Sequence, residues 1–192
     1  MEVVPYTPDH ADEMRAVCIA SASERARTSA THAAFTLAMY CDPYLEHGVA
    51  YMLVDDEGVA HGYVLACEDW DSWAENTAAY REKIEALGGE YPARYADEAG
   101  FYNMVKNDYP AHLHIDIEEP YTGGGYGRKL METLLARLRA DGVRGVVFGV
   151  AASNERAVGF YQHMGFSKLS EYDDGGGYTF CMSFDERSRT LT

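Results

Sequence analysis

The chain has 192 residues, of which 47% are hydrophobic and 24% are charged, a composition typical of one folded domain and unlike that of a disordered chain. Its formal net charge of -15 repels a phosphate backbone, so we expect no nucleic acid among its partners. The sequence contains no run of about 18 apolar residues, and its start lacks the basic and apolar regions of a signal peptide. We therefore expect neither a membrane span nor ordinary export.

Four cysteines lie far apart in the chain, with no C-x-x-C pair among them: Cys18, Cys41, Cys67 and Cys181. This spacing is not that of a zinc knuckle or a dense disulfide framework. We expect reduced thiols and a cytoplasmic location.

The first third of the chain predicts a strand, a helical region and a hairpin. A short strand at Val3 and Val4 is followed by a helix that opens at Thr7, with proline at its first position, and helical composition continues to about Met39. Two β-rich runs, 49–54 and 59–67, then flank an acidic turn that ends in glycine.

Residues 69–109 interrupt this pattern with eight aromatic residues and a turn at Leu87-Gly88-Gly89. We interpret them as a helical insertion. The insertion carries nine acidic residues against four basic ones, so it is suited to wall an acceptor groove for a cationic amine. The other interpretation is an ordinary packed helical hairpin with an acidic outer face.

A strand and a helix follow, joined by glycines. Apolar and polar residues alternate over 112–118, which is the period of a strand. Leucines recur every four residues over 130–138, which marks the buried face of a helix that Asp141-Gly142 closes.

The remaining sequence predicts a strand over 146–150, a helix from Asn154 to about Met164 with Gly165 as its stop, and a final hairpin over 166–172 and 178–184. Together these elements predict an α/β fold with a mixed sheet, hairpins at both ends and strand–helix–strand units in the middle. We expect residues 1–192 to form a single domain.

The glycine-rich turn at 122–127 joins a predicted strand directly to a predicted helix. Glycines let the backbone approach a ligand closely, and the unpaired N–H groups at a helix start attract phosphate. Residues 121–168 also carry seven basic residues against three acidic ones. Neither G-x-G-x-x-G nor G-x-x-x-x-G-K-[ST] can be aligned here, which excludes the Rossmann and P-loop motifs.

Two motifs resemble the signatures of the GNAT acetyltransferases. T-x-x-G-x-G at 122–127 is similar to their pyrophosphate loop, Q/R-x-x-G-x-G/A, although Thr122 replaces the usual arginine or glutamine. V-x3-N-x2-A-x3-Y-x3-G-F at 150–166 is similar to the second signature, and the two occur in the family's order. The closer pattern most resembles the acetyltransferase-like domain of animal O-GlcNAc hydrolases, on the stretches 55–66 and 135–145, the aromatic insertion and Phe160-Tyr161.

The resemblance implies a mostly antiparallel sheet with splayed middle strands, and acetyl-CoA as the cofactor. It implies that the backbone of the first splayed strand meets the pantetheine arm, while the glycine loop and Arg128 hold the pyrophosphate. The expected cofactor-binding residues are Ile115, Ile117, Thr122, Gly123, Gly124, Gly125, Tyr126, Gly127, Arg128, Asn154 and Tyr161. For Asn154, a helix N-cap is an equal alternative.

Amine acetylation also needs a proton donor for the departing thiolate. The resemblance implies that Tyr161 is this acid, because a phenol stays protonated at neutral pH. The alternative is a buried tyrosine that only packs.

The amine must lose a proton to a base, and Ala111 lies where some family members carry a glutamate. Asp116 and His114 are the first candidates for the base, alongside His112, Glu118 and a water relay. His112-x-His114 has no evident third ligand, so we expect no metal site.

The sequence therefore predicts an enzyme that transfers acetyl from acetyl-CoA to a primary amine by direct attack in a ternary complex. The acceptor is a small amine, or a lysine or N-terminus of a peptide, and it is cationic. The alternative is a catalytically silent acyl-CoA or peptide-binding module, which Thr122 and Ala111 favour. We expect a monomer or a homodimer.

Overall fold

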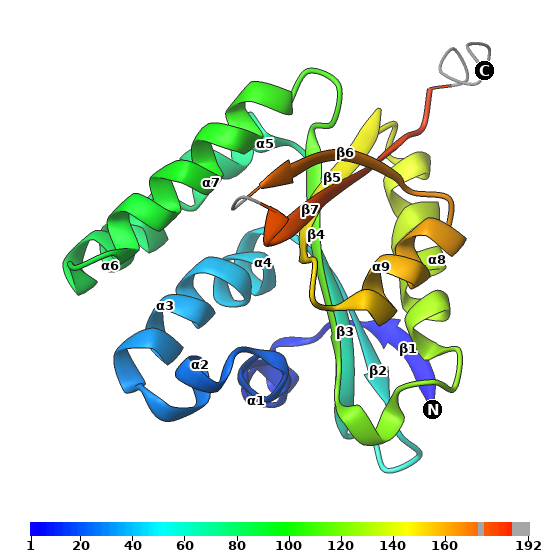
Figure 1. Cartoon of the computed structure of the whole chain (residues 1–192). Coiled ribbons are helices and arrows are strands. Elements are labelled where there is room, and N and C mark those ends of the chain that lie inside the picture. The colour runs from blue at the N-terminus through cyan, green and yellow to red at the C-terminus, as the bar shows by residue number, and fades with distance from the viewer. Residues whose placement is uncertain (173–174, 186–192) are drawn as a thin grey trace.

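A computed structural model of the protein describes residues 1–172 and 175–185 (Figure 1). These residues form a seven-stranded sheet in the order β1-β2-β3-β4-β5-β7-β6. The strands are β1 (Glu2–Pro5), β2 (Val49–Val54), β3 (Ala60–Cys67), β4 (Ala111–Ile117), β5 (Gly145–Ala151), β6 (Ser167–Tyr172) and β7 (Gly177–Ser183). All neighbouring strands are antiparallel except β4 and β5. The predicted mixed sheet is confirmed.

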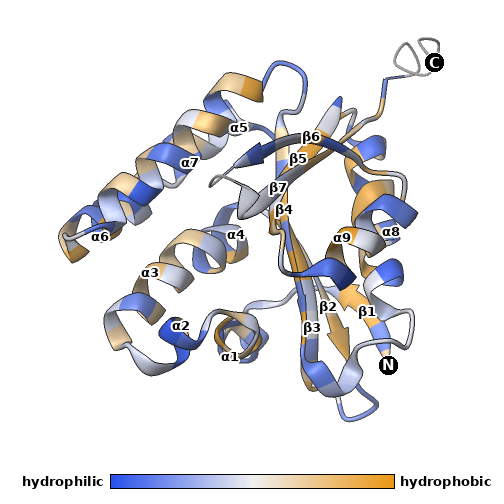
Figure 2. Ribbon diagram, in the orientation of Figure 1, coloured by the Kyte–Doolittle hydropathy of each residue, from blue (hydrophilic) through white to orange (hydrophobic). Residues whose placement is uncertain are grey.

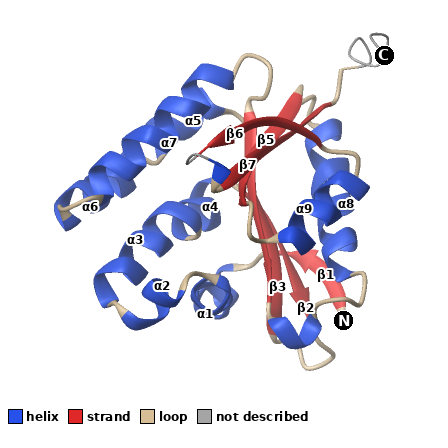
Figure 3. Ribbon diagram, viewed as in Figure 1, coloured by secondary structure: helices blue, strands red, loops and turns tan. Residues whose placement is uncertain are grey.

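Helices cover both faces of the sheet, which Figures 1 and 3 show close to edge-on. On one face lie η1 (Pro8–His10), α1 (Ala11–Ser21), α2 (Glu24–Thr28), α3 (Ala30–Tyr40), α4 (Asp42–His47), α5 (Trp70–Asn76), α6 (Ala78–Leu87) and α7 (Tyr91–Val105). On the other lie α8 (Tyr126–Ala140) and α9 (Glu155–His163). Within the described ranges, no helix has the length and apolar character needed to cross a bilayer.

The first helical region is more broken than its composition predicted. Thr7 makes no capping hydrogen bond, and regular α-helix begins only at Ala11. Ser23 and Ser29 then each cap a new helix, because each hydroxyl accepts a hydrogen bond from the backbone N–H three residues later. The expected helical run to Met39 is therefore three α-helices.

Residues 69–109 fold into α5, α6 and α7. The chain turns between α6 and α7 at Gly88 and Gly89, whose φ values of 64° and 60° lie in the left-handed region that favours glycine. Tyr80 of α6 and Tyr91 of α7 pack with Phe35 of α3 in one buried cluster. These three helices are thus packed onto the N-terminal helices rather than onto the sheet alone.

The apolar stripe of α8 is buried, as its spacing predicted. Leu130, Leu134 and Leu138 are fully buried in the core cluster on this face of the sheet, where α8 packs on β2, β3 and β4. A fully buried leucine contributes about 1.5–3 kcal/mol to folding. The burial therefore holds the first turn of α8 firmly beside the end of β4.

The last part of the chain completes the sheet. Gly165, with φ 89°, ends the helical region of α9, and β6 and β7 form the predicted hairpin. β6 is one of the two edge strands, largely exposed and hydrophilic over most of its length (Figure 2). An edge strand of polar residues resists pairing with other chains.

Candidate functional site

The centre of the sheet opens between β4 and β5. Both strands have seven residues, but only two residue pairs join them, and the second is His112 with Val147. Beyond this pair β4 stays paired with β3, and β5 stays paired with β7. The edge of β4 over Leu113–Ile117 therefore has backbone N–H and C=O groups with no strand partner on that side.

The glycine loop leads from the end of β4 into α8. Gly123 and Gly125 have φ values of 86° and 80°, and no side chain caps α8 at Gly125. The backbone N–H of Lys129 bonds the carbonyl of Gly125, so the N–H groups of the preceding residues lack partners within the helix. The loop is exposed, and these donors are available to an anion.

Thr122 does not stand alone at the start of this loop. Its hydroxyl donates to the carbonyl of Glu119 over 2.8 Å and accepts a hydrogen bond of 3.1 Å from the guanidinium of Arg156 on α9. Arg128 instead pairs with Glu132, one turn along α8, at 3.4 Å. The cation that touches the loop is therefore Arg156, which the sequence did not single out.

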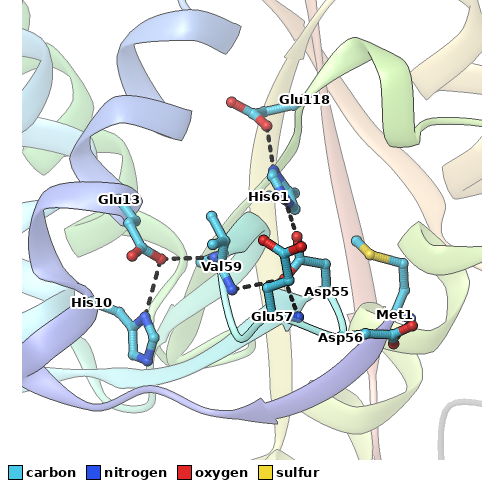
Figure 4. A network of polar contacts seen from close by, with 10 residues as sticks. Met1, His10, Glu13, Asp55, Asp56, Glu57, Val59, His61 and Glu118 are labelled. Carbon is cyan, nitrogen blue, oxygen red and sulfur yellow. Dashed lines mark hydrogen bonds and ion pairs between the residues drawn. The ribbon is translucent and has the colours of Figure 1, made fainter.

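A network around His61 fixes the end of β4 (Figure 4). His61 Nδ1 lies 2.8 Å from Glu118 and Nε2 lies 3.1 Å from Asp55, and the ring stacks on Tyr121 at 4.0 Å. The backbone N–H of Glu118 also donates to the carbonyl of His61. Glu118, a candidate base, is thus engaged at the tip of the sheet, just beyond β4.

Two candidate bases lie on the stretch of β4 that has separated from β5. Asp116 accepts a hydrogen bond of 2.5 Å from Tyr63, and burial raises the pKa of Asp116 to about 6 although this bond opposes the rise. His114 Nε2 lies 3.0 Å from the hydroxyl of Tyr44, and burial lowers the pKa of His114 to about 4. Near neutral pH the first is mostly a carboxylate and the second a neutral imidazole.

His112 lies one pair further back on the same face of β4. Its Nδ1 is 2.7 Å from the hydroxyl of Tyr44, so His112 and His114 share one hydroxyl partner. Across the part of the chain that the structure describes, no three His, Cys, Asp or Glu side chains are grouped to hold a metal ion.

Asn154 is the N-cap of α9, and Tyr161 lies near the end of this helix. Tyr161 is buried against Phe148 and Phe166. Burial first, and the charge of Asp116 second, raise the pKa of its phenol. Asn154 caps α9 by accepting a hydrogen bond of 3.1 Å from the N–H of Ala157, so its side-chain oxygen is occupied as the N-cap alternative expected.

Several residues of this region escape sequence reasoning. Tyr44, Tyr63, His61 and Arg156 reach the site from α4, β3 and α9. None lies in a motif, and the contacts of the first three depend on which helix and which strand pack against β4. Arg156 gives a weak signal, because it occupies an unspecified position within the second motif, two residues beyond Asn154.

Residues 19–166 match the model of the Acetyltransferase (GNAT) family. The [Ribosomal protein bS18]-alanine N-acetyltransferase of Escherichia coli is 28% identical over 98 residues, which are 51% of this chain and 66%, just under two thirds, of that relative. The crystal structure of SsHAT is similar to this structure with a TM-score of 0.70 at 26% identity, and the match covers 96% of this chain and 98% of the SsHAT chain. A chain of the NatC complex bound to Gag peptide and CoA shares the fold, with a TM-score of 0.57 at 14% identity, covering 96% and 100%.

Gly125 allows a direct test of the loop. With φ at 80°, Gly125→Ala places a Cβ on left-handed backbone, which costs about 1–2 kcal/mol and turns the N–H groups away from their present directions. We expect the affinity for coenzyme A to fall about tenfold, measured by calorimetry. Gly142→Ala, at φ 76° beyond the opposite end of α8, is the control and should leave this affinity unchanged. Equal affinities in both variants would reject the loop as the anion site.

The His61 bridge makes part of the stability depend on pH. Burial by itself lowers the pKa of His61, but the hydrogen bonds and charges of Glu118 and Asp55 outweigh burial and raise the pKa above 6.5. The contribution of protonated His61 to the free energy of unfolding is complete below pH 6.5 and is lost as pH rises through the raised pKa. We expect the free energy of unfolding of the wild type, relative to His61→Gln, to fall from about pH 6 to about pH 8 in urea denaturation. A constant or rising difference would contradict the bridge.

Proposed function

The chain belongs to the acetyltransferase (GNAT) family, and on this premise we propose that it transfers an acetyl group from acetyl-CoA to a primary amine within one ternary complex. The observation that carries the proposal is the parting of β4 and β5 after His112, directly beside the uncapped start of α8. An extended pantetheine arm can pair with the free edge of β4 as an added strand would. The N–H groups of the loop then meet the diphosphate.

The loop and both strands fit this cofactor. Gly124 and Gly125 are exposed, and a Cβ added at Gly125 would meet no heavy atom within 4 Å, so a ligand can approach the backbone. Ile115 and Ile117 lie on the stretch of β4 that has left β5. Residues 122–128 supply the diphosphate end in this proposal, and the amide nitrogen of Asn154 supplies a donor for the pantetheine.

Acetyl-CoA supplies an activated acetyl group as a thioester, from which a thiolate departs. Tyr161 is the proposed acid for that thiolate, since its raised pKa keeps the phenol protonated at any working pH. Asp116, as a carboxylate, attracts the ammonium form of the acceptor. His114, as a neutral imidazole, accepts the proton that the amine must lose before its nitrogen bonds the acetyl carbon.

We propose a cationic acceptor, in agreement with the net charge of -15. An N-terminal alanine is one candidate, because a curated relative is named for acetylating the alanine of a ribosomal protein. A lysine side chain and a small polyamine are the others. In this proposal residues 69–109 are an insertion in one domain and wall the acceptor groove.

The proposal also includes the subgroup of the family, the cellular compartment and the oligomeric state. The similarity of 55–66 and 135–145 to the acetyltransferase-like domain of animal O-GlcNAc hydrolases suggests the subgroup. The four cysteines are free and buried, which suits a reducing cytoplasm. We propose that the chain acts as a monomer or homodimer and has no nucleic acid partner.

The proposed activity is tested by thiol release from acetyl-CoA with three amines: a peptide with a free N-terminal alanine, an N-terminally blocked peptide with one lysine, and spermidine. We expect the wild type to acetylate at least one of them. Tyr161→Phe should lower kcat about 100-fold while the Kd for acetyl-CoA changes less than about threefold. If Tyr161→Phe keeps the kcat of the wild type, Tyr161 is not the acid that protonates the thiolate. Tight cofactor binding with no turnover would instead favour the silent binding module.

We propose that Arg156 supplies the cation that binds the diphosphate, because position 122 carries threonine rather than arginine. A guanidinium has five N–H donors, and its bond to Thr122 uses one of them, so others are available to phosphate oxygens. Arg156→Ala should therefore weaken coenzyme A binding about tenfold, whereas Arg128→Ala, whose partner is Glu132, should change it less than about threefold.

Two further measurements isolate the diphosphate. Acetyl-pantetheine, which lacks this group, should bind the wild type and Arg156→Ala equally in calorimetry. Adding Thr122→Arg to Arg156→Ala should restore most of the lost affinity. A larger loss with Arg128→Ala than with Arg156→Ala would assign the cation to α8 instead.

A further inference from the structure

The side chains of His114, Tyr44 and His112 form a series of hydrogen bonds that begins on the stretch of β4 that has separated from β5 and ends in the protein interior. The hydroxyl of Tyr44, on α4, lies 3.0 Å from His114 Nε2 and 2.7 Å from His112 Nδ1. The bond to Tyr44 uses Nε2, so Nδ1 is the ring nitrogen of His114 that remains for the acceptor amine. The three groups form one continuous hydrogen-bonded chain.

The hydroxyl of Tyr44 can form its two hydrogen bonds to the imidazoles with the protons in either of two arrangements. Tyr44 has a single proton, so it donates to one ring nitrogen and accepts from the other. Both imidazoles are neutral near pH 7, because burial lowers the pKa of each. Moving one proton at each bond converts the first arrangement into the second, so the chain can pass a proton without leaving a charge on Tyr44.

This hydrogen-bonded series ends at a buried nitrogen atom. His112 is 2% exposed, and its Nε2 has no hydrogen bond partner among the described residues. Four aromatic rings surround the imidazole at centroid distances of 4.3–5.6 Å: Tyr102, Trp73, Tyr44 and Trp70. Of these rings only Tyr102 is stacked on the imidazole, whereas Tyr44 and Trp73 meet it edge to face.

His112 also borders a cavity of about 30 Å³. A buried water needs roughly 10–15 Å³ by this kind of measure, so the cavity has room for one or two. Glu98 of α7 lies on the same cavity wall, together with Tyr44 and Tyr102. A water there can join His112 Nε2 to the carboxylate of Glu98.

Glu98 is suited to accept a proton near neutral pH. Burial raises its pKa to about 7, against the lowering effects of the hydroxyls of Tyr40 and Tyr102 and the charge of Arg94. The hydroxyl of Tyr40 on α3 donates to it over 3.0 Å. Burial lowers the pKa of His114 and raises that of Glu98, so transfer of a proton from His114 to Glu98 is favourable.

We propose that Tyr44 and His112 relay the proton of the acceptor amine from His114 to Glu98, so that α7 of the 69–109 segment takes a direct part in the proton transfer. This inference rests on the proposed acetyl transfer. It assigns Tyr44, His112 and Glu98 a role that none of the sequence motifs contains.

Each step of the relay balances. His114 Nδ1 takes the proton from the amine, and the proton on His114 Nε2 passes to the oxygen of Tyr44. The hydroxyl proton of Tyr44 passes to His112 Nδ1, and the proton on His112 Nε2 passes through water to Glu98. Both imidazoles and Tyr44 end neutral with their protons moved by one place, and Glu98 ends as a carboxylic acid that solvent can deprotonate.

The test compares kcat across about pH 6–9 for the wild type, Tyr44→Phe, Glu98→Gln and the double variant. The assay uses saturating acetyl-CoA and whichever of the alanine peptide, the lysine peptide and spermidine the wild type acetylates fastest. Tyr44→Phe keeps the ring and removes only the bridge, so kcat should fall about 30-fold with the Kd for acetyl-CoA unchanged. The fall of wild-type kcat below about pH 7 should be absent in Glu98→Gln.

Coupling distinguishes a relay from two independent packing defects. If both residues serve one chain, the double variant should be no slower than the slower single variant. Tyr95→Phe changes another tyrosine of the cavity wall and should keep wild-type kcat. Should Tyr44→Phe fail to fold, Glu98→Gln and its pH profile carry the test.

The relay is overturned if Tyr44→Phe retains kcat within about twofold of the wild type. It is also overturned if the kcat reductions of the two single variants multiply in the double variant, or if kcat of Glu98→Gln still falls below about pH 7. In these cases an active wild type leaves the proposed acetyl transfer standing. A wild type that releases thiol with none of the three amines overturns the proposed function, and the relay with it.

Discussion

The loss of pairing between β4 and β5 after His112 and Val147 is the constraint on which the site depends. Each strand is held in place by its other neighbour, β3 or β7, so the gap does not weaken the sheet elsewhere. Backbone groups of β4 that would bond β5 are left free on one edge. An unpaired edge in the middle of a sheet costs stability unless a ligand or water satisfies it.

The elements around the gap place different chemistry at its ends. The buried stripe of α8 fixes the uncapped helix start beside the end of β4, and His61 ties Glu118 to the β2–β3 hairpin. Alternation along β4 then points His112, His114 and Asp116 toward the layer that holds α4 and α7. In the proposed function, anion binding and proton transfer are thus separated along a single strand and its following loop.

The sequence predicted the parts of the fold and site that depend on local pattern. The hairpin 49–67, the leucine stripe of α8 and the glycine loop follow from periodicity and glycine positions, and they are present. The two serine caps that divide the N-terminal helices were readable too, but helical composition hid them.

The rest depends on contacts between distant segments. Tyr44 meets His112 across 68 positions, and Tyr63 meets Asp116 across 53. No periodicity specifies such partners, because they follow from the packing of α4 on the sheet and from the β3–β4 register. That Thr122 stands where the family usually has arginine or glutamine was visible in the sequence, whereas the approach of Arg156 from α9 was not.

A crystal structure of the protein with acetyl-CoA tests the central claim most directly. The account predicts the pantetheine arm between β4 and β5, hydrogen-bonded to the backbone over Leu113–Ile117, with the diphosphate at the N–H groups of Gly123–Gly127. Cofactor bound elsewhere, or a gap closed by renewed pairing of β4 with β5, would contradict it.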